Sequence, residues 1–205
     1  MSIYLSSDLH INHAAIIGYS NRPYSSVEHM NEEIIKNWNS VVSPKDTVYF
    51  LGDFCMGDRK LAGEYLKRLN GASIKLIAGN HDTRVTRSFF SEVYPYIKYP
   101  LGTFDPETHQ AEYFLMIHNP YAVKNLPSDV IKGIKFVCCG HVHEKWRIKG
   151  KGDFVETYIA VEHSDEGFVV ETPFVNVGLD VNGYKPILLD DIIEEMKPLH
   201  MSKKK

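Results

Sequence analysis

Short apolar runs alternate with amphipathic segments along most of this 205-residue chain. Runs with the length and composition of buried strands lie at 3–7, 47–51, 74–78, 113–117 and 135–139. Amphipathic segments with helical spacing separate the first three runs. This strand–helix alternation predicts an α/β fold, and the strand-rich later part adds antiparallel strands and an α+β character.

The segment 25–42 has the pattern of an amphipathic helix. Ser25 and Glu28 have the spacing of a capping box, which predicts where the helix begins. Apolar residues at helical spacing predict its buried face: Met30, Ile34, Ile35 and Trp38.

Three further segments predict helices. The segment 61–69 has apolar residues on one face, and Gly71 suits the C-cap of that helix. The segment 82–94 predicts a short helix, and 189–197 predicts a last one.

The later part of the chain predicts an antiparallel hairpin. It spans about 153–179 and turns near Asp165 to Gly167. No internal repeat or low-complexity linker divides the chain, so we expect one domain over residues 1–198 and a basic tail over 199–205.

Charge and cysteine content narrow the classes of protein. A net charge of −3 gives no argument for an extended nucleic-acid surface. Cys55 and the adjacent pair Cys138 and Cys139 form a poor disulfide framework, which favours a reducing compartment. No basic leader precedes the first strand, and no window approaches the roughly 18 apolar residues of a membrane span. We therefore expect a cytoplasmic protein without a membrane partner.

Polar residues follow each of the five apolar runs, where ligands bind in open α/β sheets. They are Asp8 and His10, then Asp53, then Asn80, His81 and Asp82, then His118, and last His141 and His143. Each group alone has an ordinary explanation as a helix cap, a turn or a solvated loop. Together they would meet at one edge, where carboxylates and imidazoles packed without a partner are costly. Metal ions remove that cost, and a mixed Asp, His and Asn set suits borderline divalent metals.

The ordered motifs "DLH", "GD", "GNHD", a single histidine after a strand and "GHVH" resemble the calcineurin-like metallophosphoesterase superfamily. The flanking text "NRPYSSVEHMNEEIIKNWNSVVSPKDTVYFLGDF" and the closing "NVGLDVNGYKPILLDDI" are similar to small single-domain phosphoesterases of bacteria and their phages. The resemblance implies a four-layer β-sandwich flanked by helices. It also implies a dinuclear metal site at the carboxyl ends of the strands.

Two divalent ions are implied by this resemblance, with Mn²⁺ expected first and Ni²⁺, Fe²⁺, Co²⁺ or Zn²⁺ as alternatives. Asp53 is expected to bridge them. The other ligands form one set for each ion: Asp8, His10 and His143, and then Asn80, His118 and His141. Alternate residues of an extended segment point in opposite directions, so we expect a turn at Gly140 that lets each nearby histidine serve one ion.

The resemblance also implies a mechanism, in which a hydroxide that bridges the metals attacks phosphorus. His81 is expected to protonate the leaving group or to stabilise charge. Asp82 is expected to orient the His81 ring, to cap the helix that follows, or to do both.

Four further residues are candidate substrate contacts. Asn12 and His13 continue the first loop, and His13 has a structural role as its alternative. Arg22 could pair bidentately with phosphate or anchor the loop to a nearby carboxylate. Tyr121 could stack on a base or pack in the protein.

The function expected from the sequence is hydrolysis of phosphate mono- or diesters, with a small phosphate ester or nucleotide as substrate. The alternative is a nuclease or a phosphodiesterase that processes nucleic-acid ends. The acidic balance of the chain weighs against a nucleic-acid partner. A scaffold without activity is disfavoured because every expected ligand is present together with His81.

Overall fold

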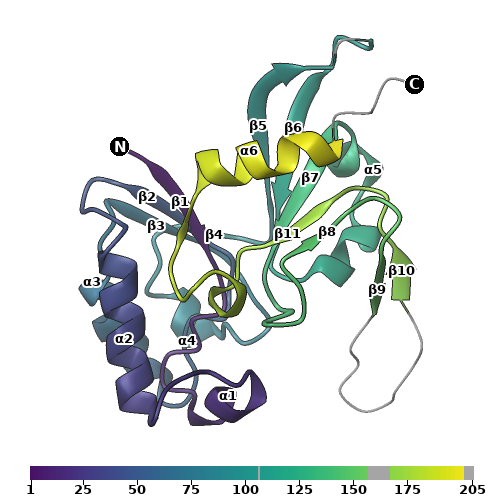
Figure 1. Ribbon diagram of the computed structural model, residues 1–205. Coiled ribbons are helices and arrows are strands. Elements are labelled where there is room, and N and C mark those ends of the chain that lie inside the picture. The colour runs from purple at the N-terminus through teal and green to yellow at the C-terminus, as the bar shows by residue number, and fades with distance from the viewer. Residues whose placement is uncertain (106, 157–166, 201–205) are drawn as a thin grey trace.

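Two five-stranded β-sheets pack face to face in the computed structural model of the chain, which describes residues 1–105, 107–156 and 167–200 (Figure 1). The strands of the first sheet, in order across it, are β12 (Ile187–Leu188), β1 (Ile3–Ser6), β2 (Thr47–Phe50), β3 (Ser73–Ile77) and β4 (Val93–Tyr94). Strands β1 to β4 are parallel, and β12 pairs antiparallel with β1.

The second sheet combines three parallel strands with two antiparallel edges. Its strands, in order, are β5 (Ile97–Phe104), β6 (Ala111–Met116), β7 (Ile134–Cys139), β11 (Phe174–Asn176) and β8 (Ile148–Lys149). Strands β6, β7 and β11 run parallel, while β5 and β8 run antiparallel to their neighbours. Strands β9 (Phe154–Glu156) and β10 (Gly167–Val169) form a separate antiparallel ribbon.

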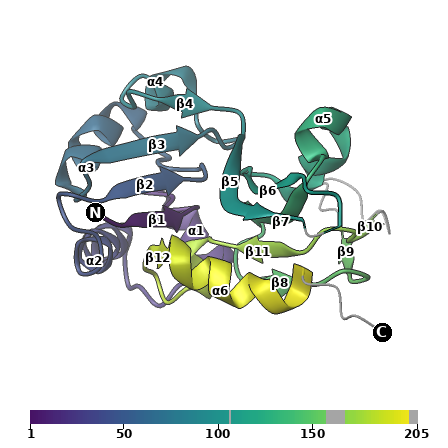
Figure 2. The same cartoon turned by 90° about the horizontal axis from the view of Figure 1, so that it is seen from above.

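Helices lie outside the sheets and along one side of the sandwich. They are α1 (Ala14–Tyr19), α2 (Val27–Asn39), α3 (Ala62–Arg68), α4 (Arg84–Arg87), α5 (Ser128–Ile131) and α6 (Leu189–His200), with 3₁₀ turns η1 (Arg59–Leu61), η2 (Pro120–Asn125) and η3 (Leu179–Val181). Figure 2 shows α2 and α3 outside the first sheet, α5 outside the second, and α6 beside both. The predicted α/β class is confirmed.

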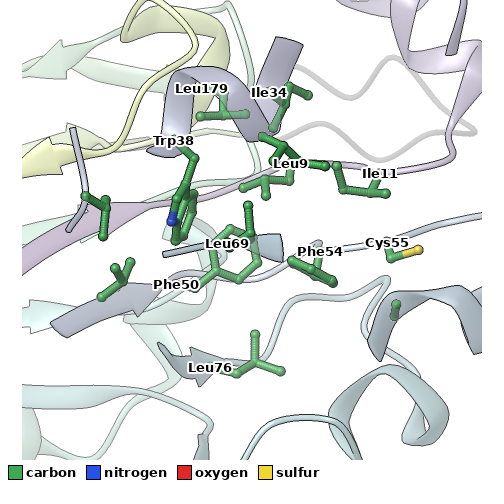
Figure 3. Close-up of a cluster of buried hydrophobic side chains, with 14 of the residues drawn as sticks. Leu9, Ile11, Ile34, Trp38, Phe50, Phe54, Cys55, Leu69, Leu76 and Leu179 are labelled. Atoms are coloured by element: carbon green, nitrogen blue, oxygen red, sulfur yellow. The ribbon is translucent and has the colours of Figure 1, made fainter. Parts of the chain in front are cut away.

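Three apolar clusters hold these layers together. Helix α2 turns its predicted face, which includes Ile34 and Trp38, onto Phe50 and Leu76 of the first sheet (Figure 3). A second cluster fills the space between the sheets, and α6 contributes to it. A third cluster lies on the other face of the second sheet, where η2 and the β9–β10 ribbon cover it. Burial on both faces explains why the central strands are continuous apolar runs.

Two helix ends differ from the sequence prediction. The N-cap of α2 is Ser26, which accepts the backbone N–H of His29, while the hydroxyl of Ser25 contacts the His29 ring. The helix therefore begins one residue later than predicted, and His29 takes the N3 position that the predicted capping box gave to Glu28. The C-cap of α3 is Leu69 in an extended conformation, and Gly71 lies beyond it.

The predicted helix over 82–94 is wrong over most of its length. Only Arg84–Arg87 is helical, and Val93–Tyr94 forms β4 beside β3. Pairing with the open edge of β3 satisfies backbone groups that would otherwise lack partners there. Strand β5 was not predicted, because Pro100 and Gly102 interrupt it and much of it is exposed.

The predicted hairpin over 153–179 is correct only for its first two strands. Strands β9 and β10 pair antiparallel, and most of the expected turn lies outside the described residues. Gly167, expected in that turn, pairs with Glu156 inside the ribbon. Strand β11 leaves the ribbon and joins β7, because its three buried residues complete the second sheet.

Helix α6 continues to His200, past the expected start of the tail at 199.

None of the described helices has both the length and the hydropathy of a membrane span.

Candidate metal centre

The expected ligands lie together where the parallel strands of both sheets end. The first sheet supplies loops after β1, β2 and β3, and the second sheet supplies loops after β6 and β7. Parallel strands carry their carboxyl ends to the same edge, so two packed sheets place five loops around one point. Two groups of side chains result, each able to hold a metal ion.

The first group consists of Asp8, His10 and His143, whose ligand atoms all lie within 4.8 Å of one another. Asp8 Oδ1 lies 3.8 Å from His10 Nε2 and 3.9 Å from His143 Nε2. The other oxygen of Asp8 accepts the backbone N–H of His141 at 2.9 Å. One carboxylate oxygen therefore holds the loop and the other faces the two imidazoles.

The second group consists of Asp53, His118 and His141. Asn80 Oδ1 lies 3.0 Å from both His118 Nε2 and His141 Nδ1, so its amide oxygen joins this group. The Nδ1 atom of His118 lies 2.6 Å from the carbonyl oxygen of Leu51, to which it must donate. That bond leaves Nε2 of His118 as the atom able to bind a cation.

Asp53 lies between the two groups. Its Oδ2 atom is 3.6 Å from His10 Nε2 and 3.3 Å from His118 Nε2. Its Oδ1 atom accepts the backbone N–H of His81 at 2.9 Å. This position is the one that a carboxylate bridging two cations would need.

Buried polar atoms without partners test whether metal ions fit these groups. Asp8 Oδ1 and His10 Nε2 are buried and have no hydrogen-bond partner, although each faces the centre of the first group. Such orphaned atoms are costly and rare in proteins. A divalent cation would satisfy both, and the oxygen and imidazole donors suit borderline metals. The first group therefore fits a divalent ion, and the donors of the second group, Asp53, His118 and His141, could hold another.

The protonation preferences of Asp8, Asp53 and His141 agree with this fit, whereas that of His118 opposes it, because a cation would have to displace a proton from its Nε2 atom. Burial opposes ionisation of Asp8 and Asp53, but the neighbouring histidines outweigh it and lower the pKa of both carboxyl groups. Burial, together with the charge of His118, lowers the pKa of His141 to about 4. For His118 burial also opposes protonation, yet the bond to Asp53 and the charge of Asp8 raise its pKa to about 9. Both acids are thus ionised at neutral pH and could bind cations.

The loops reach this geometry through strained backbone. Left-handed φ values occur at five expected ligands: Asp8 (60°), His10 (51°), Asp53 (60°), His141 (71°) and His143 (47°). Non-glycine residues rarely adopt this conformation, which is concentrated at functional sites. The turn expected at Gly140 begins there, where the carbonyl oxygen of Gly140 accepts the backbone N–H of Val142 at 2.9 Å, and its left-handed residues are the two histidines. Gly140 is needed for close approach, because a Cβ there would collide with Ser7 and Asp8.

The comparison with known families agrees with the geometry. The model of the calcineurin-like phosphoesterase superfamily domain matches residues 1–178. The chain belongs to this superfamily. It is therefore a metal-dependent phosphoesterase, as the resemblance of its motifs implied.

Proteins similar to this phosphoesterase cover either most of its length or a part of it. The uncharacterized protein MJ1445 of Methanocaldococcus jannaschii is 38% identical over 196 residues, which are 94% of this chain and 89% of that protein. Gene 66 protein of Mycobacterium phage L5 is 36% identical over 81 residues, or 38% of this chain and 39% of that protein. The protein of unknown function AQ665 from Aquifex aeolicus has a similar fold, with a TM-score of 0.63, 22% identity, and coverage of 95% of this chain and 98% of that one.

The two expected catalytic residues of the phosphoesterase occupy different surroundings. His81 lines a cavity beside the metal groups, and its ring centroid lies 5.7 Å from that of His10. Asp82 does not act on that ring. Its carboxylate accepts the backbone N–H groups of Asp53, Phe54 and Gly79 at 2.9–3.0 Å.

Both roles expected for Asp82, orienting the His81 ring and capping the following helix, are therefore wrong. Thr83, not Asp82, is the N-cap residue of α4. The acid is buried, and the sharp loop after β3 turns its side chain back toward the end of β2. It fixes the loop that carries Asp53, which is a positioning role.

Arg22 also has a positioning role. Of the two roles considered from the sequence, it anchors the loop to a carboxylate and does not contact phosphate. Its side chain is 0% exposed and pairs with Asp180 at 2.8 Å, so it cannot reach a substrate. The sequence analysis missed Asp180, which also lies 2.9 Å from His143 Nδ1. The same strand-end rule could have found it, because Asp180 follows β11, which lies parallel to β7.

The other expected substrate contacts divide between the cavity and the protein interior. His13 lines the cavity, and burial together with His10 lowers its pKa to about 4. Asn12 is turned toward α2, where its amide oxygen accepts a hydrogen bond from Asn31 at 2.7 Å. Tyr121 packs with the third apolar cluster, and its ring lies edge-on to His141 with centroids 5.8 Å apart.

Cys138 and Cys139 lie on opposite faces of β7, in the second and third apolar clusters. Both are free thiols, as predicted, and burial raises the pKa of each. We expect the variant Cys138→Ala/Cys139→Ala to keep the full metal content of the wild-type chain, although with a lower melting temperature from lost packing. Metal analysis by mass spectrometry checks this, and loss of either ion would contradict it.

Proposed function

We propose that this phosphoesterase hydrolyses phosphate mono- or diesters of small, nucleotide-like compounds with two divalent ions. The observation that carries the proposal is the pair of adjacent ligand groups with Asp53 between them. The proposed ligands are Asp8, His10 and His143 for one ion, Asn80, His118 and His141 for the other, and Asp53 for both.

When bound, the two ions would lower the pKa of water to supply a nucleophile and would neutralise charge on the phosphate. The chain's own residues act around that centre. His81 borders both the cavity and the metal groups, so its imidazole is suitably placed to donate a proton to a departing oxygen. Asp82 keeps the Asp53 loop in place while the ester is turned over.

The size of the cavity supports the proposal of a small substrate. Its volume is about 440 Å³, within the range of pockets for small molecules. Its lining includes histidines of the metal groups, and Ile16, Tyr19 and Met56 give it an apolar and aromatic wall. We propose that an ester with its phosphate at the histidines places its organic group against this wall. A planar group such as a nucleobase suits that wall, because Tyr19 is exposed and available for stacking.

An assay panel tests the proposed function. The chain, loaded separately with Mn²⁺, Ni²⁺, Co²⁺ or Zn²⁺, would be given p-nitrophenyl phosphate, bis-p-nitrophenyl phosphate, cyclic nucleotides, nucleotides and single-stranded DNA. We expect turnover of the small esters, fastest with Mn²⁺, and little cleavage of DNA. Activity confined to DNA would favour the nuclease alternative, and no turnover with any metal would refute the proposal.

A further inference from the structure

A buried carboxylate supports one metal ligand from behind. Asp180 lies in η3, after the last parallel strand, and its side chain is 1% exposed. Its Oδ2 atom is 2.9 Å from His143 Nδ1, on the opposite side of the imidazole from the metal group. An ionised carboxylate can only accept hydrogen bonds, so Nδ1 of His143 must carry the proton. In the neutral imidazole that binds a metal, the lone pair is then on Nε2, the atom that faces Asp8 Oδ1.

Arg22 locks this carboxylate in place. Its Nε atom donates to Asp180 Oδ1 at 2.8 Å, and Nη2 donates to Oδ2 at 3.1 Å. The same guanidinium donates to the carbonyl oxygens of Leu9 at 2.9 Å and Asp8 at 2.7 Å. Asp8 has left-handed backbone, so these bonds hold a strained turn at a ligand. The buried guanidinium of Arg22 is therefore bonded both to the backbone of Asp8 and to the carboxylate of Asp180 beside His143.

The two metal groups differ in the acceptor that the Nδ1 atom of a histidine ligand faces. In the second group the Nδ1 atom of His118 donates to a neutral backbone carbonyl, that of Leu51. In the first group the corresponding bond is made to a charged side chain from the far end of the chain. Asp180 also lies beyond residues 1–178, the part that matches the family model.

We infer that Asp180, held by Arg22, is a positioning residue that fixes the tautomer and ring orientation of His143 for the first metal ion. It acts through His143 and has no contact with the reacting ester. Partners of this kind change metal affinity by about 10-fold to 100-fold when they are replaced. The inference rests on the metal centre of the proposed function and is tested by binding, without any assay of turnover.

The test is a titration of the metal-free full chain with Mn²⁺, comparing wild type with Asp180→Asn and Asp180→Ala. We expect wild type to bind two ions, and Asp180→Asn to bind one of them about 10-fold or more weakly while the other changes little. Asp180→Asn keeps the shape and a hydrogen-bonding group. It therefore carries the test alone if Asp180→Ala, which leaves a buried Arg22 unpaired, fails to fold. Asp190→Asn removes the same charge from an exposed position on α6 and should bind both ions as wild type does.

A second measurement separates positioning from general stability. In the Zn²⁺-loaded chain, nitrogen NMR of the imidazoles should show His143 protonated at Nδ1 in wild type and altered in Asp180→Asn, with His118 unchanged. Two ions bound with wild-type affinity by Asp180→Asn, or both weakened equally, would overturn the inference while leaving the proposed function standing. Failure of wild type to bind metal would overturn both.

Discussion

Asp53→Asn is expected to lose bound metal and turnover together. Asp53 Oδ2 lies between His10 Nε2 and His118 Nε2, so a neutral amide there removes negative charge shared by both groups. We expect activity to fall by more than the roughly 100-fold that loss of a supporting partner causes, because a direct ligand is changed. Metal content per chain and kcat for bis-p-nitrophenyl phosphate provide the measurement.

A matched control for this variant lies in the same loop. Asp58 is exposed, and Asp58→Asn makes the same chemical change away from the metal groups. It should keep wild-type metal content and rate. If Asp53→Asn instead kept both ions and full activity, the assignment of Asp53 as the shared ligand would be wrong.

His81→Ala is expected to separate catalysis from metal binding. The His81 backbone N–H, which donates to Asp53 Oδ1, remains after the substitution, so both metal groups should stay intact. Loss of a general acid lowers the rate by about 10²-fold to 10⁴-fold. Metal content should equal that of wild type, while kcat falls by that amount for an ester with an alkyl leaving group.

The choice of leaving group sharpens the test of His81. p-Nitrophenolate leaves readily without a proton, so its esters should show a much smaller defect in His81→Ala than alkyl esters do. His109→Ala, an exposed histidine on the second sheet's outer loop, serves as the control and should match wild type. Equal defects for both kinds of ester would show that His81 binds substrate or stabilises charge and does not donate a proton.

The sequence identified the expected ligands because their positions follow a local rule. Each one comes directly after a run of apolar residues, and such a run signals a strand buried on both faces. The rule was not applied to β11, which is only three residues long, and Asp180 was missed for that reason. The helix predicted over 82–94 failed for another reason: the helical start ends at Arg87, and the segment continues to β4, which pairs with the edge of β3.

The sequence by itself determined which acids, amides and imidazoles stand at strand ends, and the order of its motifs indicated a metal-dependent phosphoesterase. Tertiary structure decided what each polar side chain faces. The residue types and positions of Arg22 and Asp82 led the sequence analysis to consider them as a substrate contact and a catalytic residue. In the structure both are buried: Arg22 bonds backbone carbonyl groups and a carboxylate, and Asp82 bonds backbone N–H groups. Asp82 meets the loop that carries Asp53 because β2 and β3 are parallel neighbours in one sheet. Arg22 meets Asp180, 158 residues away, because packing two sheets brings their loops to one edge. The spacing of apolar residues predicts whether a segment is a helix or a strand and where it ends. Hydrogen bonds between loops depend instead on how the elements pack.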